Sequence, residues 1–492
     1  MKANRNVRPL AAAVLLVGLL AACTAGPDYV RPAAEVPAAY KEAFAWQPAS
    51  PRDHLPRGNW WSAFGDARLD ALLAQVNVSN QTLVAAEAQF RQSAALAETA
   101  RAAWFPSLTA GLSETRSRPS GTTGPVVGVA TSKRTIYSTP LNFSWEADLW
   151  GRIRRSVEAS ESTAQASAAD VENARLSLQA QLAQDYFLLR ALDSQKRLLE
   201  ATVAAYAKSL ELTNNRYRTG VVARIDVAQA EAQLKSTQSQ LLDLGVQRAQ
   251  LEHAIAVLVG RPPAGFAIAP ADLALKPPPL PVALPAELLE RRPDIAAAER
   301  RVAAANAQIG VAEAAWFPTA TLSASYGFQT ATAAQWFTLP SRFWSVGPAL
   351  ALPLLDGGRR TAAGNQAVAA YDAAVANYRQ AVLTGFQEVE DNLAALRILE
   401  EEARVQGEAA AAAEKSLEYS INQYKAGITT YLQVVSAQAT ALSAQRSASD
   451  ILARRMSASV QLVKALGGGW EAAALPSGED MRRRAGRTVP AQ

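Results

Sequence analysis

Ala102-Ala103-Trp104-Phe105-Pro106 returns further along the chain as Ala314-Ala315-Trp316-Phe317-Pro318. In both places the stretch ends a long helical pattern and opens an alternating one. A second pair of motifs, Tyr217-x-x-Gly220 and Tyr424-x-x-Gly427, recurs in the same order. The two spacings are 212 and 207 residues, far longer than the period of a solenoid repeat. The sequence therefore predicts two copies of one large module.

The first 22 residues have the pattern of a secretory signal. A basic leader precedes an apolar run from Pro9 to Leu20, which is too short for a comfortable membrane span, so an uncleaved anchor is the weaker alternative. Cys23 is the only cysteine, and its place after Leu20-Ala21-Ala22 resembles a bacterial lipobox. We expect diacylglycerol and fatty acyl chains on Cys23 rather than a buried thiol. Thr24 after the cysteine favours sorting to the outer membrane.

The composition argues against an enzyme. One cysteine permits no internal disulfide, and two distant histidines, His54 and His253, form no metal-ligand cluster. Gly357-Gly358-Arg359-Arg360 lacks the Lys-Ser/Thr of a phosphate-binding loop, and no Ser/His/Asp arrangement is apparent. The net charge of +5 includes three basic signal residues and gives no reason to expect nucleic-acid binding. We expect no catalytic residue, no metal and no other cofactor.

Long helices dominate both copies. From Arg152 to Thr219 there is no Gly or Pro, so this one helix would span on the order of 100 Å at 1.5 Å per residue. Gly220 ends it, and a second helix is expected to double back as far as Val259. The remaining helical patterns cover residues 60–103, 285–315, 360–425 and 428–466.

Two hairpins with period-two alternation interrupt the helices, at about 107–147 and about 319–355. Leu322, Ala324 and Tyr326 alternate with small polar residues. A half-buried strand of a soluble sandwich is the simpler alternative, but an exported chain with strands near nine to eleven residues favours a transmembrane sheet. Four strands cannot close a barrel, whereas three chains would supply twelve.

These patterns divide the chain into segments. The expected boundaries are a lipoprotein signal peptide at 1–22, an extended segment at 23–58, a first repeat at 59–261, a Pro-rich linker at 262–284, a second repeat at 285–470 and a disordered tail at 471–492.

Five motifs in order then resemble a known family. They are residues 23–32, Trp60-Trp61 to Asp66, Leu289 to Ile295 and the two Tyr-x-x-Gly tips. They are similar to those of the outer-membrane factors, TolC-like trimeric export channels, and of the lipoprotein branch that serves resistance-nodulation-division efflux pumps. The resemblance implies a mainly α homotrimer in the outer membrane of a Gram-negative bacterium. Its twelve-stranded barrel, four strands per chain, would continue into a periplasmic α-helical barrel.

The same resemblance implies partners and a gate. A periplasmic adaptor and an inner-membrane pump would pass drugs or other small molecules into the duct. Gly220 and Gly427 would make the turns at its periplasmic end. The residues assigned to the gate are Tyr217, Asp226, Tyr424, Thr429, Gln433 and Ser436. Relatives commonly carry acidic residues at the last two positions, which puts a cation-selective ring in doubt here, and Asp226 is equally open to a role as helix N-cap.

Two other features have plain structural interpretations. Arg291, Arg292 and Asp294 surround Pro293 at a helix start, where we expect the arginines to pair across chains. Glu299 is expected on a solvated helix face.

A lipid-anchored coiled-coil spacer without a pore is the alternative function. The Ala-rich helices favour it. The two amphipathic hairpins argue against it, because a spacer does not need them.

Overall fold

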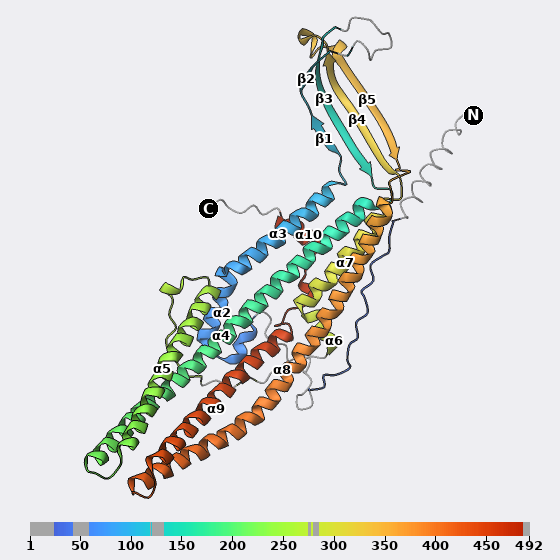
Figure 1. Cartoon of the computed structure of the whole chain (residues 1–492). Helices are drawn as coiled ribbons and strands as arrows, with labels where there is room; N and C mark the ends of the chain where they lie inside the picture. Colours follow the sequence, from blue (N-terminus) through green and yellow to red (C-terminus); the bar gives the residue numbers. More distant parts are fainter. Residues whose placement is uncertain are drawn as a thin grey trace.

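The computed structural model describes residues 24–42, 59–118, 120, 132–273, 277–278 and 285–485. The predicted signal peptide, Cys23 and residues 43–58 lie outside this part of the chain. A small β-sheet stands at one end of the molecule, and two long helical hairpins extend from it to tips that lie side by side (Figure 1). No helix in the described residues is long and apolar enough to cross a bilayer.

The helices fall into two series. The first comprises η2 (Trp60–Phe64), α2 (Ala67–Ser79), α3 (Gln81–Ala102), α4 (Arg152–Arg218) and α5 (Arg224–Leu258), and the second comprises α6 (Pro285–Arg291), α7 (Pro293–Ala314), α8 (Arg359–Lys425) and α9 (Tyr431–Ala465), with the short η3 (Pro263–Gly265) between them. Lengths match in pairs: α3 and α7 have 22 residues, α4 and α8 have 67, and α5 and α9 have 35.

One break in the first series was not expected. The pattern from Asp66 to Phe105 has no Gly or Pro, yet the helix stops at Asn80 and restarts. Asn80 accepts a bond from the Leu83 amide through its side-chain oxygen and donates its Nδ2 to the Leu258 carbonyl, at 2.9 and 2.8 Å. Asn80 caps α3 and bonds to the end of α5, so the helix is interrupted here without a Gly or a Pro.

The strands form one antiparallel sheet in the order β1-β3-β4-β5. They are β1 (Ser107–Ala110), β2 (Ser113–Ser117), β3 (Arg134–Ala147), β4 (Thr319–Thr330) and β5 (Arg342–Ala351), with the turns η4 (Ala333–Gln335) and η5 (Leu339–Ser341) between the last two. β1 and β2 both pair with β3 in a single register. They are halves of one strand, separated opposite Pro140, which has no amide hydrogen to donate. The chain thus contributes the width of four strands.

The main core lies at the waist of the molecule, where η2 and α2 pack on the middle of α4. Trp60 and Phe64 are buried there, and the Phe64 ring lies 5.1 Å from that of Phe187. Tyr186 donates a 2.6 Å hydrogen bond to Asp66, whose other oxygen caps α2. This contact fixes the short helices against the long one.

Residues 24–42, which we call the strap, run extended along the outside of the helices (Figure 1). The strap begins at the foot of the sheet, where the Ala25 amide donates to the Trp150 carbonyl at 3.0 Å. It crosses α7 at Gly26, whose φ is +87° and whose added Cβ would lie 2.4 Å from the Gly310 Cα. Only glycine fits this crossing.

The strap ends at the waist, and charged groups hold it along the way. The Glu390 carboxylate accepts from the amides of Lys41 and Glu42 at 2.7 and 3.0 Å. Tyr29 donates to Glu299, which is buried, so the expectation of a solvated Glu299 is wrong. Burial raises the pKa of Tyr29 above its usual value. The strap itself is what covers Glu299.

The expected pairing of Arg291 and Arg292 across chains is also wrong for Arg292, which lies at the N-cap of α7. Its side chain is buried and forms 2.6 Å ion pairs with Asp294 and with Glu388 of α8. It also donates to the Ala465 carbonyl at the end of α9. Pro293 occupies the first turn of α7 as expected. The cluster braces three helices of one chain.

The tail predicted as disordered is ordered over residues 471–485. It contains η6 (Ala472–Ala474) and α10 (Gly478–Ala485). Ser477 and Asp480 exchange hydrogen bonds at the start of α10, and Arg101 of α3 donates to the Gly478 carbonyl at 3.4 Å. The polar composition of residues 471–485 suggested disorder, but capping at the start of α10 and packing on α3 give these residues a defined structure. Residues 486–492 lie outside the described part.

Candidate functional site

The two helical tips have the same backbone. Gly220 and Gly427 both have φ of +75°, which favours glycine. In each turn the amide of the next residue bonds back across the helix end, from Val221 to Arg216 and from Ile428 to Gln423. This is the Schellman pattern that ends a helix tightly. Both long hairpins therefore reverse within a few residues at the same end of the molecule (Figure 1).

Tyr424 joins the second tip to the first. It is 3% exposed, and the guanidinium of Arg216 from α4 lies 4.6 Å from the centre of its ring. Arg216 also donates to the Tyr424 carbonyl at 2.5 Å. A cation over an aromatic face and a charge-assisted hydrogen bond thus hold the same tyrosine.

Tyr431 extends this contact at the start of α9. Its ring meets that of Tyr424 edge to face at 5.2 Å, and its hydroxyl lies 3.0 Å from the Ser209 hydroxyl on α4. The Tyr424 hydroxyl donates at 3.5 Å to Thr213. Burial raises the pKa of Tyr431. We call Ser209, Thr213, Arg216, Tyr424 and Tyr431 the tip cluster.

The other predicted gate residues lie outside the tip cluster. Tyr217 is 42% exposed although its motif matches that of Tyr424. Thr429 is half-buried, and Gln433 and Ser436 are exposed. Nothing in one chain tests whether these residues meet those of a neighbour, so their role as a gate stays a prediction.

Asp226 is not the N-cap of α5. The cap position is Ala223, and Asp226 lies in the first turn, where its charge favours the positive end of the helix dipole. Its carboxylate accepts no hydrogen bond within the described residues. It lies near enough to Tyr431 to contribute to the raised pKa of that phenol. Asp226 is therefore a neighbour of the cluster.

The sequence signal for the missed members of the cluster is weak. Ser209, Thr213 and Arg216 follow the four- and three-residue steps of one helix face. Many faces of a 67-residue helix satisfy this spacing, so the pattern could not single them out.

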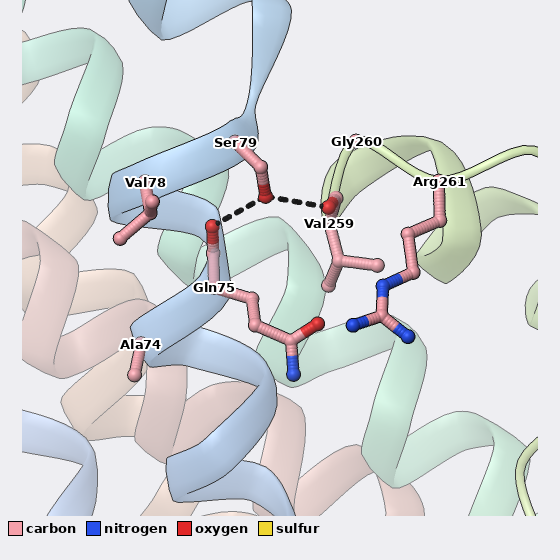
Figure 2. A pocket seen from close by; sticks show the side chains of 7 residues that line it. All are labelled: Ala74, Gln75, Val78, Ser79, Val259, Gly260 and Arg261. Atoms are coloured by element: carbon pink, nitrogen blue, oxygen red, sulfur yellow. Dashed lines mark hydrogen bonds between the residues drawn. The ribbon is translucent and has the colours of Figure 1, made fainter.

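A pocket of about 500 Å³ lies where the ends of α2 and α5 meet (Figure 2). Its lining residues are Ala74, Gln75, Val78, Ser79, Val259, Gly260 and Arg261. Ser79 donates to the Val259 carbonyl at 2.7 Å and closes one side. Arg261 is its only charged group, so the pocket offers no acid–base pair.

A second buried charged cluster, around Asp193, holds the chain segment that follows α5. Asp193 pairs with Arg248 at 2.7 Å and accepts from the Ala271 amide at 3.1 Å. Arg248 also donates to the Ile268 carbonyl. Among the described residues, no group of His, Cys, Asp and Glu could hold a metal ion. These charges fix a loop in place.

Comparisons with known proteins identify similar proteins over most of the chain. A family model described as outer membrane efflux protein matches residues 72–261 and 284–468. The pyoverdine export outer membrane protein OpmQ of Pseudomonas aeruginosa is 34% identical over 417 residues, which cover 84% of this chain and 87% of the relative. The toluene efflux pump outer membrane protein TtgF of Pseudomonas putida is 31% identical over 460 residues, covering 92% and 95%.

A solved structure is similar over the same extent. The outer-membrane channel OprN superimposes with a TM-score of 0.85 at 32% identity, covering 91% of this chain and 100% of that chain. The similarity therefore includes the sheet, the long hairpins and the waist.

Proposed function

Because this chain belongs to the outer membrane efflux protein family, we propose that three copies form the exit duct of a tripartite efflux system. The family is one of outer-membrane efflux channels and not of enzymes. The observation that carries the proposal is a sheet of four strand widths with two unpaired edges, standing on hairpins of 67-residue helices. Three such sheets would close a twelve-stranded barrel.

The proposed barrel must be closed because its strands would lie in the hydrocarbon of the membrane. Backbone groups on an open edge have no partner in hydrocarbon, so a membrane sheet must close completely. Mass measurement of the detergent-solubilised protein should give three chains per particle. A stable monomer would contradict the barrel, because both edges would then face lipid. The long hairpins would continue the barrel into the periplasm as a helical tunnel.

The duct would receive its cargo from a periplasmic adaptor and an inner-membrane pump of the resistance-nodulation-division class. The named relatives export pyoverdine and toluene, two very different molecules. This difference supports a duct that passes small molecules chosen elsewhere. A pore-free spacer is not supported, because the relatives are outer-membrane components of export systems.

The tips would form the periplasmic gate, with Tyr217, Asp226, Tyr424, Thr429, Gln433 and Ser436 at or near the mouth. If Gln433 and Ser436 line that mouth, their replacement by Asp would add a ring of carboxylates. We expect Gln433→Asp with Ser436→Asp to strengthen cation preference and block by trivalent cations in planar bilayers. Unchanged block in an assembled channel would exclude these two residues from the mouth.

Cys23 would carry the lipid anchor. The start of the strap supports this, because Ala25 is bonded to Trp150 at the foot of the sheet. The Trp150 ring stacks on exposed Phe317, which follows exposed Trp316 in the chain. Tryptophans of this kind gather at membrane interfaces. Cys23→Ser should abolish labelling by radioactive palmitate, and unchanged label would contradict the anchor. Assembly should fall without being lost, since the barrel also inserts.

A further inference from the structure

The charged residues of the sheet are distributed unevenly between its two ends. The end away from the helices, which we call the rim, carries all the cationic residues of segments 107–145 and 319–351, namely Arg116, Arg118, Lys133, Arg134 and Arg342. All five are exposed, and none forms an ion pair within the described residues. Glu114 is the only carboxylate in the two segments, so their net charge is +4.

The foot of the sheet, where the long helices begin, has a different charge pattern. Arg152 pairs with Glu146 at 2.7 Å. Arg360 pairs with Asp356 at 2.6 Å. The Asp148 carboxylate accepts hydrogen bonds from two backbone amides at the start of α4. Carboxylates therefore neutralise much of the cationic charge at the foot, whereas the charge of the rim is left unpaired.

Two of the rim cations lie on the apolar face of the sheet. This face carries Leu141 of β3 and Phe328 of β4. Arg342 lies opposite Phe328 and therefore on the same face. Arg116 lies opposite Thr135, an even number of residues before Leu141 in β3, so Arg116 also lies on the apolar face. The proposed channel would turn this face towards lipid, which places both arginines on the membrane side of the rim.

The turns between β4 and β5 place aromatic rings on the same side of the rim (Figure 1). Trp336 stacks on Phe337 at 5.5 Å. Trp336 also lies 4.9 Å from Tyr137, and Phe337 meets Phe328 at 5.7 Å. Tyr137 and Phe328 both belong to the apolar face, so these turns fold over the outside of the sheet. Phe337 is nonetheless 65% exposed, as is typical of an aromatic side chain that lies beside lipid headgroups.

We infer that the membrane side of the rim binds the phosphate groups of lipopolysaccharide in the outer leaflet of the outer membrane. The inference rests on the proposed function, in which the long helices leave the foot towards the periplasm and the rim faces the outside. Basic residues beside a membrane attract anionic headgroups. Arginine binds phosphate through two parallel hydrogen bonds.

The arginines on the apolar face would take separate phosphates. Arg116 and Arg342 belong to strands three spacings apart, about 14 Å across the sheet. One phosphate cannot reach both guanidinium groups at that separation. Copies of the chain around a barrel would repeat the pair, so a belt of guanidinium groups would face the headgroups, with Phe337 beside them.

Binding can be measured with the full-length, detergent-solubilised protein and fluorescently labelled diphosphoryl lipid A. Arg116→Gln with Arg342→Gln should weaken binding about 25-fold, since each cation beside an anionic surface contributes about fivefold in affinity. Arg116→Lys with Arg342→Lys keeps the charge and should keep most of the affinity. The parent should bind dephosphorylated lipid A about as weakly as the glutamine variant binds the diphosphoryl form.

The matched control is Arg154→Gln with Arg359→Gln. It removes two exposed arginines from the foot, so the net charge changes by the same amount. Binding of diphosphoryl lipid A by this variant should equal that of the parent. An equal loss in the foot and rim variants would assign the binding to overall charge and overturn the inference.

The remaining outcomes separate the rim from the channel. Unchanged binding by the glutamine variant in a three-chain particle overturns the inference and leaves the proposed channel standing. If that variant fails to assemble, the parent decides, because equal binding of diphosphoryl and dephosphorylated lipid A overturns the inference as well. A monomeric mass for the parent overturns the inference together with the proposed assembly.

Discussion

The two helical tips carry the same motif in different surroundings. Tyr217 and Tyr424 occupy equivalent places before equivalent glycine turns, yet the first is 42% exposed and the second 3%. The difference arises because α4 supplies Arg216 to the second tip, whereas no hydrogen bond or ring contact from the second tip reaches the Tyr217 side chain within the described residues. The repeated Tyr-x-x-Gly motif therefore determines the backbone turn. The contact between the two hairpins determines which of the two tyrosines is buried.

Replacing the two tyrosines in turn should give the largest contrast. Tyr424→Ala empties a buried site, and such aromatic deletions cost about 3–5 kcal/mol. Tyr217→Ala changes an exposed residue, for which about 0.5 kcal/mol is usual. We expect several-fold higher single-channel conductance for Tyr424→Ala and parental conductance for Tyr217→Ala. Equal behaviour of the two variants would show that burial at the tip does not control the pore.

Arg216 offers a comparison within one turn of α4. Arg216→Met keeps much of the bulk and loses both the cation over Tyr424 and the bond to its carbonyl, about 1–3 kcal/mol together. Arg218→Met is the control, because Arg218 is exposed. Since about 1.4 kcal/mol is a factor of ten in an equilibrium, we expect a roughly five- to hundredfold rise in the open-to-closed ratio for Arg216→Met alone.

That ratio can be measured as channel open probability in planar bilayers. Cells should in parallel become sensitive to a large antibiotic that the outer membrane excludes. If both arginine variants open the channel equally, general charge near the tip is responsible, and the specific contact with Tyr424 is not.

The smallest effect concerns Tyr431 and alkaline pH. Burial raises the pKa of Tyr431 in this structure, so the contribution of its neutral phenol to this arrangement of the tip is complete below the ordinary pKa near 10 and is lost as the pH rises above that value. Open probability should therefore rise as the pH is raised above about 10. Tyr431→Phe should open slightly more at neutral pH, having lost about 1 kcal/mol of hydrogen bonding to Ser209. Its response to pH should be flatter, and an equally steep response would assign the transition to another group.

The sequence was most informative where one local signal dominates. The absence of Gly and Pro from Arg152 to Thr219 predicted α4 to within one residue, since nothing else competes with helix over that span. The alternation of Leu322, Ala324 and Tyr326 likewise predicted β4. These features depend on neighbours along the chain.

The sequence was least informative where distant segments meet. Glu299 reads as a solvated residue because the strap that covers it lies 270 positions away. Asn80 ends a helix by bonding to the end of α5, and residues 471–485 are ordered by packing on α3. At the tip, Arg216 belongs to the first sequence repeat of the chain and Tyr424 to the second. Such contacts leave no periodic trace in the sequence.

The equal lengths of α4 and α8 constrain how the gene can change. Seven residues inserted into α4 alone would push the first tip about 10 Å beyond the second and carry Arg216 away from Tyr424. α5, which returns the chain from the first tip to the waist, would then have to lengthen with α4. To keep the two tips level, α8 and its return helix α9 would have to lengthen by the same amount. A longer or shorter descendant therefore requires matched insertions or deletions in four helices, and single-helix length variants should be rare among inherited forms of this chain.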